Sequence, residues 1–128
     1  MKKCDYCGKE ITYFEQYCCD ECQRKTLDFY DYQAKYSKFF GIVNAVCVMG
    51  IPIGLFMFSL VRPIGFTMMS FAVLFLGLMI VIFPFPVENM ISSMKLKKAV
   101  DVTRIIGAVL LALGILLVIL DFIFFIRF

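Results

Sequence analysis

Three long stretches of this chain carry almost no charge, and they restrict what it can fold into. Residues 39–61 and 63–87 contain no charged side chain, and residues 105–126 contain a single acid. A hydrocarbon core of about 30 Å needs roughly 20 apolar residues of helix. In lipid the backbone must satisfy its own hydrogen bonds, so we expect helix in all three. The rest of the chain has too little polar sequence to cover them in a soluble fold.

The predicted fold is therefore mainly α, with three transmembrane helices. The first two spans, residues 39–61 and 64–86, are separated by Arg62 and Pro63, which favours a tight helical hairpin. The third span, residues 105–126, follows a predicted cytoplasmic amphipathic loop at 88–104. Within the first span, Gly50 and Gly54 either let another helix pack closely or soften a kink at Pro52.

Basic residues predict the orientation of a multi-pass protein of the cell membrane. Seven precede the first span and four lie between the second and third, whereas the first turn and the C-terminal end carry one each. Alternating sides therefore gives eleven basic residues on one side and two on the other. The N-terminus is expected in the cytoplasm and the C-terminus outside. The four bases of the second loop are expected to contact lipid headgroups and set the topology: Lys95, Lys97, Lys98 and Arg104.

The polar part of the chain is short. Residues 1–38 hold seven of the ten acids and seven of the thirteen bases. A segment of this length needs a staple such as a metal, because it cannot bury enough apolar surface to fold alone. The net charge of +3 gives no reason to expect a nucleic-acid partner. Residues 26–38, which lack Gly and Pro, are predicted to form a juxtamembrane helix whose tyrosines lie in the headgroup layer or form a partner-binding face.

Cysteines supply the expected staple in residues 1–25. Cys4 and Cys7 are followed by Gly8, which permits a tight turn around a metal, and a second set follows further along as Cys18, Cys19 and Cys22. Four thiolates in two pairs form the closed tetrahedral site that structural zinc prefers. The chain has no histidine, so the site must be all sulfur.

The second pair of ligands has two possible members. Cys19 and Cys22 have the common two-residue spacing, whereas Cys18 and Cys22 lie one helical turn apart. The segment CDYCG…YCCDECQ resembles short treble-clef or zinc-ribbon modules whose second half reads Phe/Tyr-Cys-Ser-x-x-Cys. That resemblance, limited to residues 4–24, implies Cys4, Cys7, Cys18 and Cys22 as ligands, with Cys19 in the serine place as the alternative to Cys18. Such modules also begin small prokaryotic membrane proteins of uncharacterised function.

Other chemistries also use four cysteines. An iron–sulfur cluster or a mononuclear iron site is compatible with the same residues, so iron is an alternative to zinc. Disulfides belong to oxidising compartments, whereas the basic residues place this end of the chain in the reducing cytoplasm. A redox-active cysteine pair needs a strand–helix context that this segment lacks. The predicted metal-binding segment, residues 1–25, is called the knuckle below. The apolar residues Ile11, Tyr13, Phe14 and Tyr17 are expected to pack against its metal site.

Asp121 is the one acid inside an apolar run. Intramembrane acids are candidates for transport or proton transfer, but Arg62 and Arg127 are predicted on the same side and would neutralise it near the interface. No catalytic constellation is recognisable, and an enzyme is not expected. The leading hypothesis is a non-enzymatic membrane protein whose zinc knuckle serves docking to a protein partner or assembly. The alternatives are a small homo-oligomeric transport or channel subunit and a cytoplasmic metal or thiol sensor.

Overall fold

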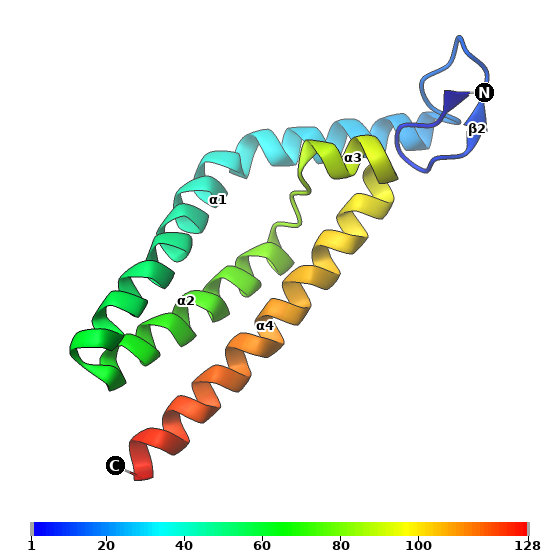
Figure 1. Cartoon of the computed structure of the whole chain (residues 1–128). Coiled ribbons are helices and arrows are strands. Elements are labelled where there is room, and N and C mark those ends of the chain that lie inside the picture. Colours follow the sequence, from blue (N-terminus) through cyan, green and yellow to red (C-terminus); the bar gives the residue numbers. More distant parts are fainter. Residues whose placement is uncertain (1, 128) are drawn as a thin grey trace.

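Among residues 2–127, which a computed structural model describes, three helices are long and apolar enough to cross a membrane (Figure 1). They are α1 (Asp20–Leu60), α2 (Arg62–Ile82) and α4 (Leu96–Arg127). A short helix, α3 (Glu88–Met94), precedes α4, and two short strands, β1 (Lys2–Lys3) and β2 (Glu10–Ile11), form a hairpin at the N-terminal end. The predicted three-helix architecture with an N-terminal cysteine cluster is confirmed.

Helix α1 is longer than any membrane requires. Its 41 residues correspond to about 62 Å, roughly twice the hydrocarbon thickness. The juxtamembrane helix and the first span are therefore one continuous element, with Pro52 inside it. The polar first part of α1, residues 20–38, extends beyond the bundle toward the hairpin (Figure 1), and it is called the arm below.

The turn between α1 and α2 is as tight as its sequence predicts. Only Val61 interrupts the two helices, and its N–H donates to the carbonyl of Met57 at 2.7 Å. Pro63 lies in the first turn of α2, where a backbone N–H has no helical partner to lose. A side chain at Gly65 would collide with the backbone of Phe58, so the two helices approach most closely beside the turn.

The second span ends earlier than the sequence boundary at residue 86. Helix α2 stops at Ile82, because Pro84 disfavours helical geometry in the residue before it. The extended segment that follows packs its aromatic rings against the arm and the residues just after it. Ring centroids of Phe83 and Tyr36 lie 5.4 Å apart, and those of Phe85 and Phe40 lie 5.1 Å apart. Tyr32 also contacts both phenylalanines while remaining 40% exposed, so Tyr32 and Tyr36 pack against this segment on one side only.

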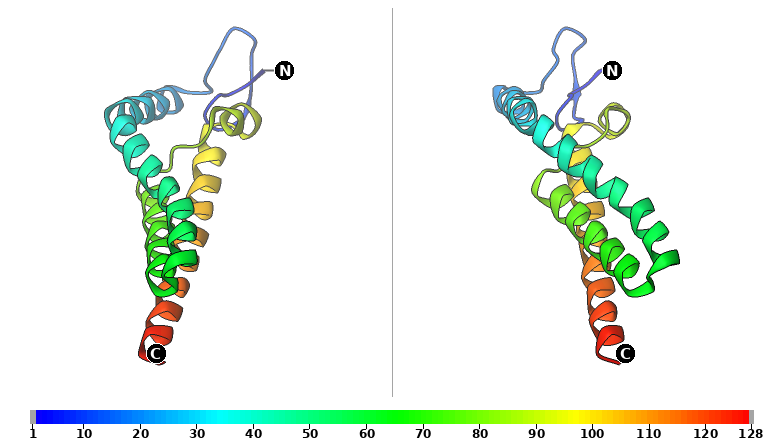
Figure 2. Two further views of the ribbon diagram at one scale, coloured as in Figure 1. Left: turned by 60° about the vertical axis from the view of Figure 1, so that its left-hand side comes forward. Right: turned by 90° about the vertical axis from the view of Figure 1, so that its left-hand side faces the viewer.

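Helix α2 lies between α1 and α4 and packs against both (Figure 2). The contact with α4 is close because glycines form it. A side chain on Gly77 would come within 2.8 Å of the Leu111 Cα atom, and one on Gly107 within 2.9 Å of the Val81 nitrogen. Gly54 of α1 similarly faces Met69 of α2, which assigns it to close helix packing. Helices without a bulky residue at the crossing gain contact along their backbones.

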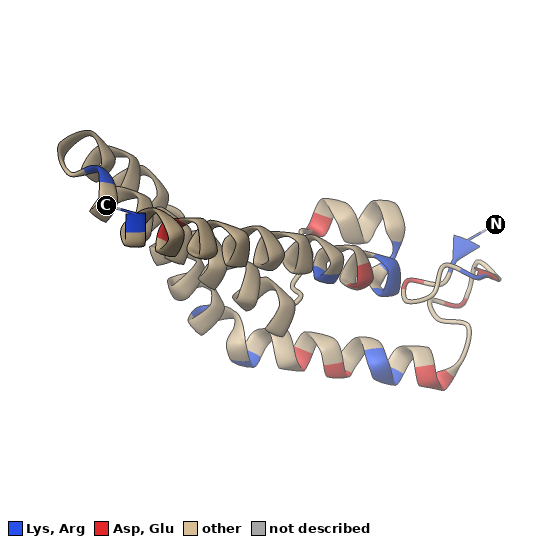
Figure 3. Ribbon diagram, turned by 90° about the horizontal axis from the view of Figure 1, so that it is seen from below, with Lys and Arg blue, Asp and Glu red and all other residues tan. Residues whose placement is uncertain are grey.

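Charges divide the molecule into zones. Lys, Arg, Asp and Glu gather at the two ends of the long helices, and the middle of the bundle is free of them (Figure 3). Residues 88–104 are not a loop: α3 ends at Lys95, whose φ of 67° breaks the helix, and α4 begins at Leu96. Residues 96–104 are therefore the first turns of the third long helix.

Candidate metal centre

The hairpin holds the first cysteine pair. Lys2 pairs with Ile11 and Lys3 with Glu10, which closes the loop that carries Cys4 and Cys7. Within it the Cys4 N–H donates to the Lys9 carbonyl at 2.8 Å, and the Gly8 N–H donates to the Cys4 carbonyl at 2.9 Å. Gly8 has a φ of 75°, a left-handed conformation that glycine adopts without strain. The glycine after the pair is therefore required by the turn.

The start of α1 supplies the second pair. Cys18 precedes the helix and Cys22 lies in its first turn, with Cys19 at the N-cap. The Sγ atoms of Cys4, Cys7, Cys18 and Cys22 all lie within 4.8 Å of one another. Two of these separations are 3.4 Å (Cys7–Cys18) and 3.3 Å (Cys18–Cys22). Four sulfurs about 2.3 Å from a tetrahedral ion would be about 3.8 Å apart, so these four residues could hold a metal ion.

Cys19 lies beside the cluster. Its Sγ is 3.8 Å from that of Cys18, and the residue is exposed. The four grouped sulfurs include Cys18 and leave Cys19 out. The pairing implied by the resemblance to treble-clef modules is therefore the one that the geometry brings together.

The thiols of Cys4, Cys18 and Cys22 differ in pKa. Burial raises the pKa of Cys4, but hydrogen bonds from the backbone of Cys7, Cys18 and Tyr6 outweigh it and bring the pKa down to about 6. For Cys18, the hydrogen bond with Cys22 lowers the pKa, while contacts with Cys7 and partial burial raise it, with a net value of about 11. The pKa of Cys22 is also raised, first by its hydrogen bond with Cys18. One thiolate is favoured beside protonated neighbours, and a bound cation would replace those protons.

The knuckle loop is attached to the start of α4. The Leu96 N–H donates to the Asp5 carbonyl at 3.2 Å, and the Lys97 N–H donates to the Tyr6 carbonyl at 3.1 Å. The first N–H groups of a helix have no partner within the helix, so the loop between Cys4 and Cys7 caps α4. Leu96 is 1% exposed, which indicates that this contact is closely packed.

The Asp5 side chain adds a second connection. One carboxylate oxygen accepts from Lys95 Nζ at 3.2 Å and the other from Gln16 Nε2 at 3.1 Å. Asp5 thus joins the knuckle to the loop before Cys18 and to the residue that separates α3 from α4. Sequence reasoning missed this role, because no local pattern relates residue 5 to residues 95–97.

The loop between β2 and Cys18 was expected to pack inward, and its tip does not. Phe14 is fully exposed and Tyr13 is 75% exposed. The knuckle therefore has one face on α4 and an aromatic tip, Tyr13 and Phe14, that points into solvent.

The remaining predicted site residues separate into different places. Lys95 is paired with Asp5, and Lys98 is exposed. Lys97 and Arg104 line a cavity of about 470 Å³ between the arm, the knuckle and α4. Asp121 lines another cavity at the far end of the bundle, together with Arg62 and Arg127.

No protein-family model, curated protein or solved structure matches this chain. The assignment of a function therefore rests on the geometry of the cysteine cluster and of the helices.

Proposed function

We propose that this is a non-enzymatic integral membrane protein whose cysteine cluster binds one structural zinc ion, and that the zinc knuckle assembles the cytoplasmic end of the helix bundle. The observation that carries the proposal is the pair of backbone hydrogen bonds from Leu96 and Lys97 to the loop between Cys4 and Cys7. The loop that would hold two zinc ligands is the same loop that caps the third long helix. Zinc binding and helix anchoring are thereby joined.

Zinc fits the donors better than other ions. An all-thiolate set near tetrahedral spacing suits zinc, and its four protein ligands leave no open position for water or substrate. Such an ion would be structural rather than catalytic. It would fix the segment that precedes α1, which has almost no apolar core, since the binding free energy of the metal is also folding free energy.

The distribution of basic residues supports a cytoplasmic location for the knuckle. The hairpin, the arm and residues 95–104 carry eleven of the thirteen bases, and such segments stay in the cytoplasm. The reducing conditions there would keep the thiols available to a metal. Arg62 and Arg127 would then lie on the outer side.

Docking to a partner protein is the second part of the proposed role. The Tyr13 and Phe14 tip is formed by the knuckle but takes no part in its contact with α4. Exposed aromatic side chains on a rigid turn are favourable anchors for a protein interface. The same zinc ion would thus hold a partner-binding tip at a fixed place relative to the bundle.

A sensor role is the second candidate, and Cys19 favours it. The exposed Cys19 thiol lies 3.8 Å from the Cys18 sulfur. It is therefore placed to replace Cys18 as a metal ligand or to be oxidised together with Cys18. A sensor requires that Cys19 affect the lifetime of the bound metal, whereas a structural site does not.

The metal content of detergent-purified protein tests the structural-zinc and sensor roles, with Cys18→Ser and Cys19→Ser as a matched pair of neighbours. We expect about one zinc ion per chain in the wild type and in Cys19→Ser, and almost none in Cys18→Ser, because three thiolates bind zinc far more weakly than four. Transfer of the zinc to a colorimetric chelator gives its lifetime.

Three results would count against the structural-zinc proposal. Iron in place of zinc would redirect the site to electron transfer. Zinc that survives Cys18→Ser but not Cys19→Ser would reverse the ligand assignment. Zinc that leaves the wild type much more quickly than Cys19→Ser would favour the sensor.

A further inference from the structure

A charged cavity lies at the end of the bundle farthest from the cysteines. It has a volume of about 520 Å³ and is formed by the turn between α1 and α2 and by the last turns of α4. Its charged residues are Arg62, Asp121 and Arg127, and its walls are mostly apolar, including Phe58, Phe66 and Leu120. We refer to it as the Asp121 cavity.

The charged side chains around this cavity form no direct ion pair with one another within residues 2–127: no ion-pair contact shorter than 4.0 Å joins Asp121 to Arg62 or Arg127. Asp121 precedes Arg127 by six positions in α4, so it lies about 9 Å deeper along the helix axis. Charges near the hydrocarbon boundary are costly unless they are paired or hydrated. Two guanidinium groups and a deeper carboxylate therefore surround this space. It suits a ligand that carries both an anionic group and a hydrogen-bond donor.

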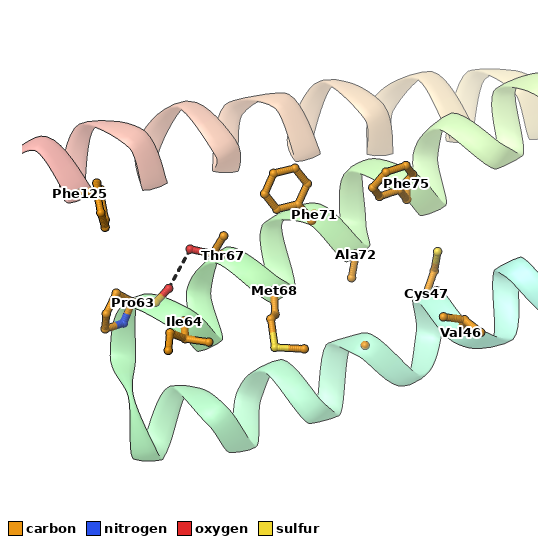
Figure 4. A pocket seen from close by; sticks show the side chains of 11 residues that line it. Val46, Cys47, Pro63, Ile64, Thr67, Met68, Phe71, Ala72, Phe75 and Phe125 are labelled. Atoms are coloured by element: carbon orange, nitrogen blue, oxygen red, sulfur yellow. Dashed lines mark hydrogen bonds between the residues drawn. The ribbon is translucent and has the colours of Figure 1, made fainter.

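An apolar groove begins beside the same cavity. Pro63 lines both, and the groove follows α2 from Ile64 to Phe75, with Val46 and Gly50 of α1 also lining it (Figure 4). With 3.6 residues per turn, these α2 residues lie on the face of the helix opposite Arg62 and Phe66. The volume of the groove is about 560 Å³. This stretch of α2 spans about 16 Å, close to half of a hydrocarbon core of about 30 Å. The groove thus has the length of one lipid chain in one leaflet, and the one hydroxyl that lines it, on Thr67, is bonded to the Pro63 carbonyl at 2.8 Å.

We propose that the Asp121 cavity binds the headgroup of a phospholipid from the leaflet at this end. The phosphate lies between the guanidinium groups of Arg62 and Arg127, which match its oxygens geometrically. The carboxylate of Asp121 accepts a hydrogen bond from a donor in the headgroup, such as the ammonium of phosphatidylethanolamine. Its acyl chains extend from the cavity into the surrounding bilayer. This site is independent of the zinc knuckle.

Native mass spectrometry of the full-length protein in detergent, titrated with single lipids, tests the proposal. Phosphatidylethanolamine has N–H donors and phosphatidylcholine has none, and the two can be supplied with identical acyl chains. We expect the wild type to bind phosphatidylethanolamine about tenfold more tightly than phosphatidylcholine, which is the usual effect of one charge-assisted hydrogen bond. Asp121→Leu, which suits a membrane helix, should bind both lipids equally.

The arginines should affect both lipids alike. Arg62→Gln and Arg127→Gln are each expected to weaken both by about tenfold, while Lys38→Gln, at the opposite end of the span, should change neither. Circular dichroism of each variant checks that the helices form.

Two results would overturn the assignment. Equal binding of both lipids by the wild type and all variants would mean that the lipids only surround the helices. Displacement of the lipid by excess inorganic phosphate would mean that the cavity takes a soluble phosphate and that the acyl chains contribute nothing.

Discussion

Cys4→Ser is expected to remove the metal and to unfold the segment before α1, while the three long helices remain. Cys4 is fully buried, and its Sγ accepts the Cys18 N–H at 3.4 Å, so it joins both halves of the knuckle. Without the metal, the hairpin has only two paired residues in each strand and is not stable alone.

Limited proteolysis with trypsin measures this effect. Lys9 lies in the loop that the metal would close, and its carbonyl accepts the Cys4 N–H. We expect cleavage after Lys9 to be at least about tenfold faster in Cys4→Ser, because an unfolded loop is open to the protease most of the time. Helicity by circular dichroism should change little. Cys47→Ser, a substitution of a buried cysteine within α1, is the matched control. Slow cleavage in Cys4→Ser would show that the knuckle folds without its metal.

Gly77→Leu is expected to separate α2 from α4. A Cβ atom at this position would lie 2.7 Å from the Leu110 carbonyl carbon and 2.8 Å from the Leu111 Cα atom. Both are backbone atoms of a helix and cannot turn aside as a side chain would. Gly107 and Gly114 of α4 bring the same two helices together on either side of this point, so the whole contact would have to widen.

Unfolding by sodium dodecyl sulfate in mixed micelles measures the loss. We expect Gly77→Leu to destabilise the protein by about 1–3 kcal/mol or more, the usual cost of inserting a large side chain into a packed contact. Gly41→Ala is the control, since a Cβ atom there has no neighbour within 4 Å, and alanine should raise stability slightly through its helix propensity. An equal response to both substitutions would contradict the close α2–α4 packing.

The long helices are the part of this fold that sequence reveals most readily. Apolar runs long enough to cross a bilayer leave helix as the available conformation, and Pro63 places the turn. The ends of the helices are less predictable. Residues 96–104 belong to the predicted amphipathic loop at 88–104, because Lys97, Lys98 and Asp101 interrupt the hydrophobic pattern. They are helical in the structure, and the start of that helix is capped by Asp5 and Tyr6, which come from the opposite end of the sequence.

Spacing predicts three members of the cysteine cluster and leaves Cys18 and Cys19 as alternatives for the fourth, which the resemblance to treble-clef modules assigns to Cys18. Spacing indicates two pairs of thiolates, and the fold brings Cys4, Cys7, Cys18 and Cys22 together. The exposure of Phe14 could not be inferred, because an aromatic residue in a short segment normally packs inward. The charges of Arg62, Asp121 and Arg127 were expected to pair, whereas within residues 2–127 they line a common cavity without an ion pair.

The central claim is that one metal ion both folds the knuckle and fixes the start of α4. Amide hydrogen exchange at Leu96 and Lys97 tests it directly, in detergent-solubilised protein before and after removal of zinc with a chelator. Both amides should be protected in the zinc-loaded protein and should exchange at least about a hundredfold faster without zinc. The amides of Leu110 and Leu111, in the middle of α4, should not change. If Leu96 and Lys97 exchange equally slowly with and without zinc, the knuckle does not need its metal to hold the third helix, and the account is wrong.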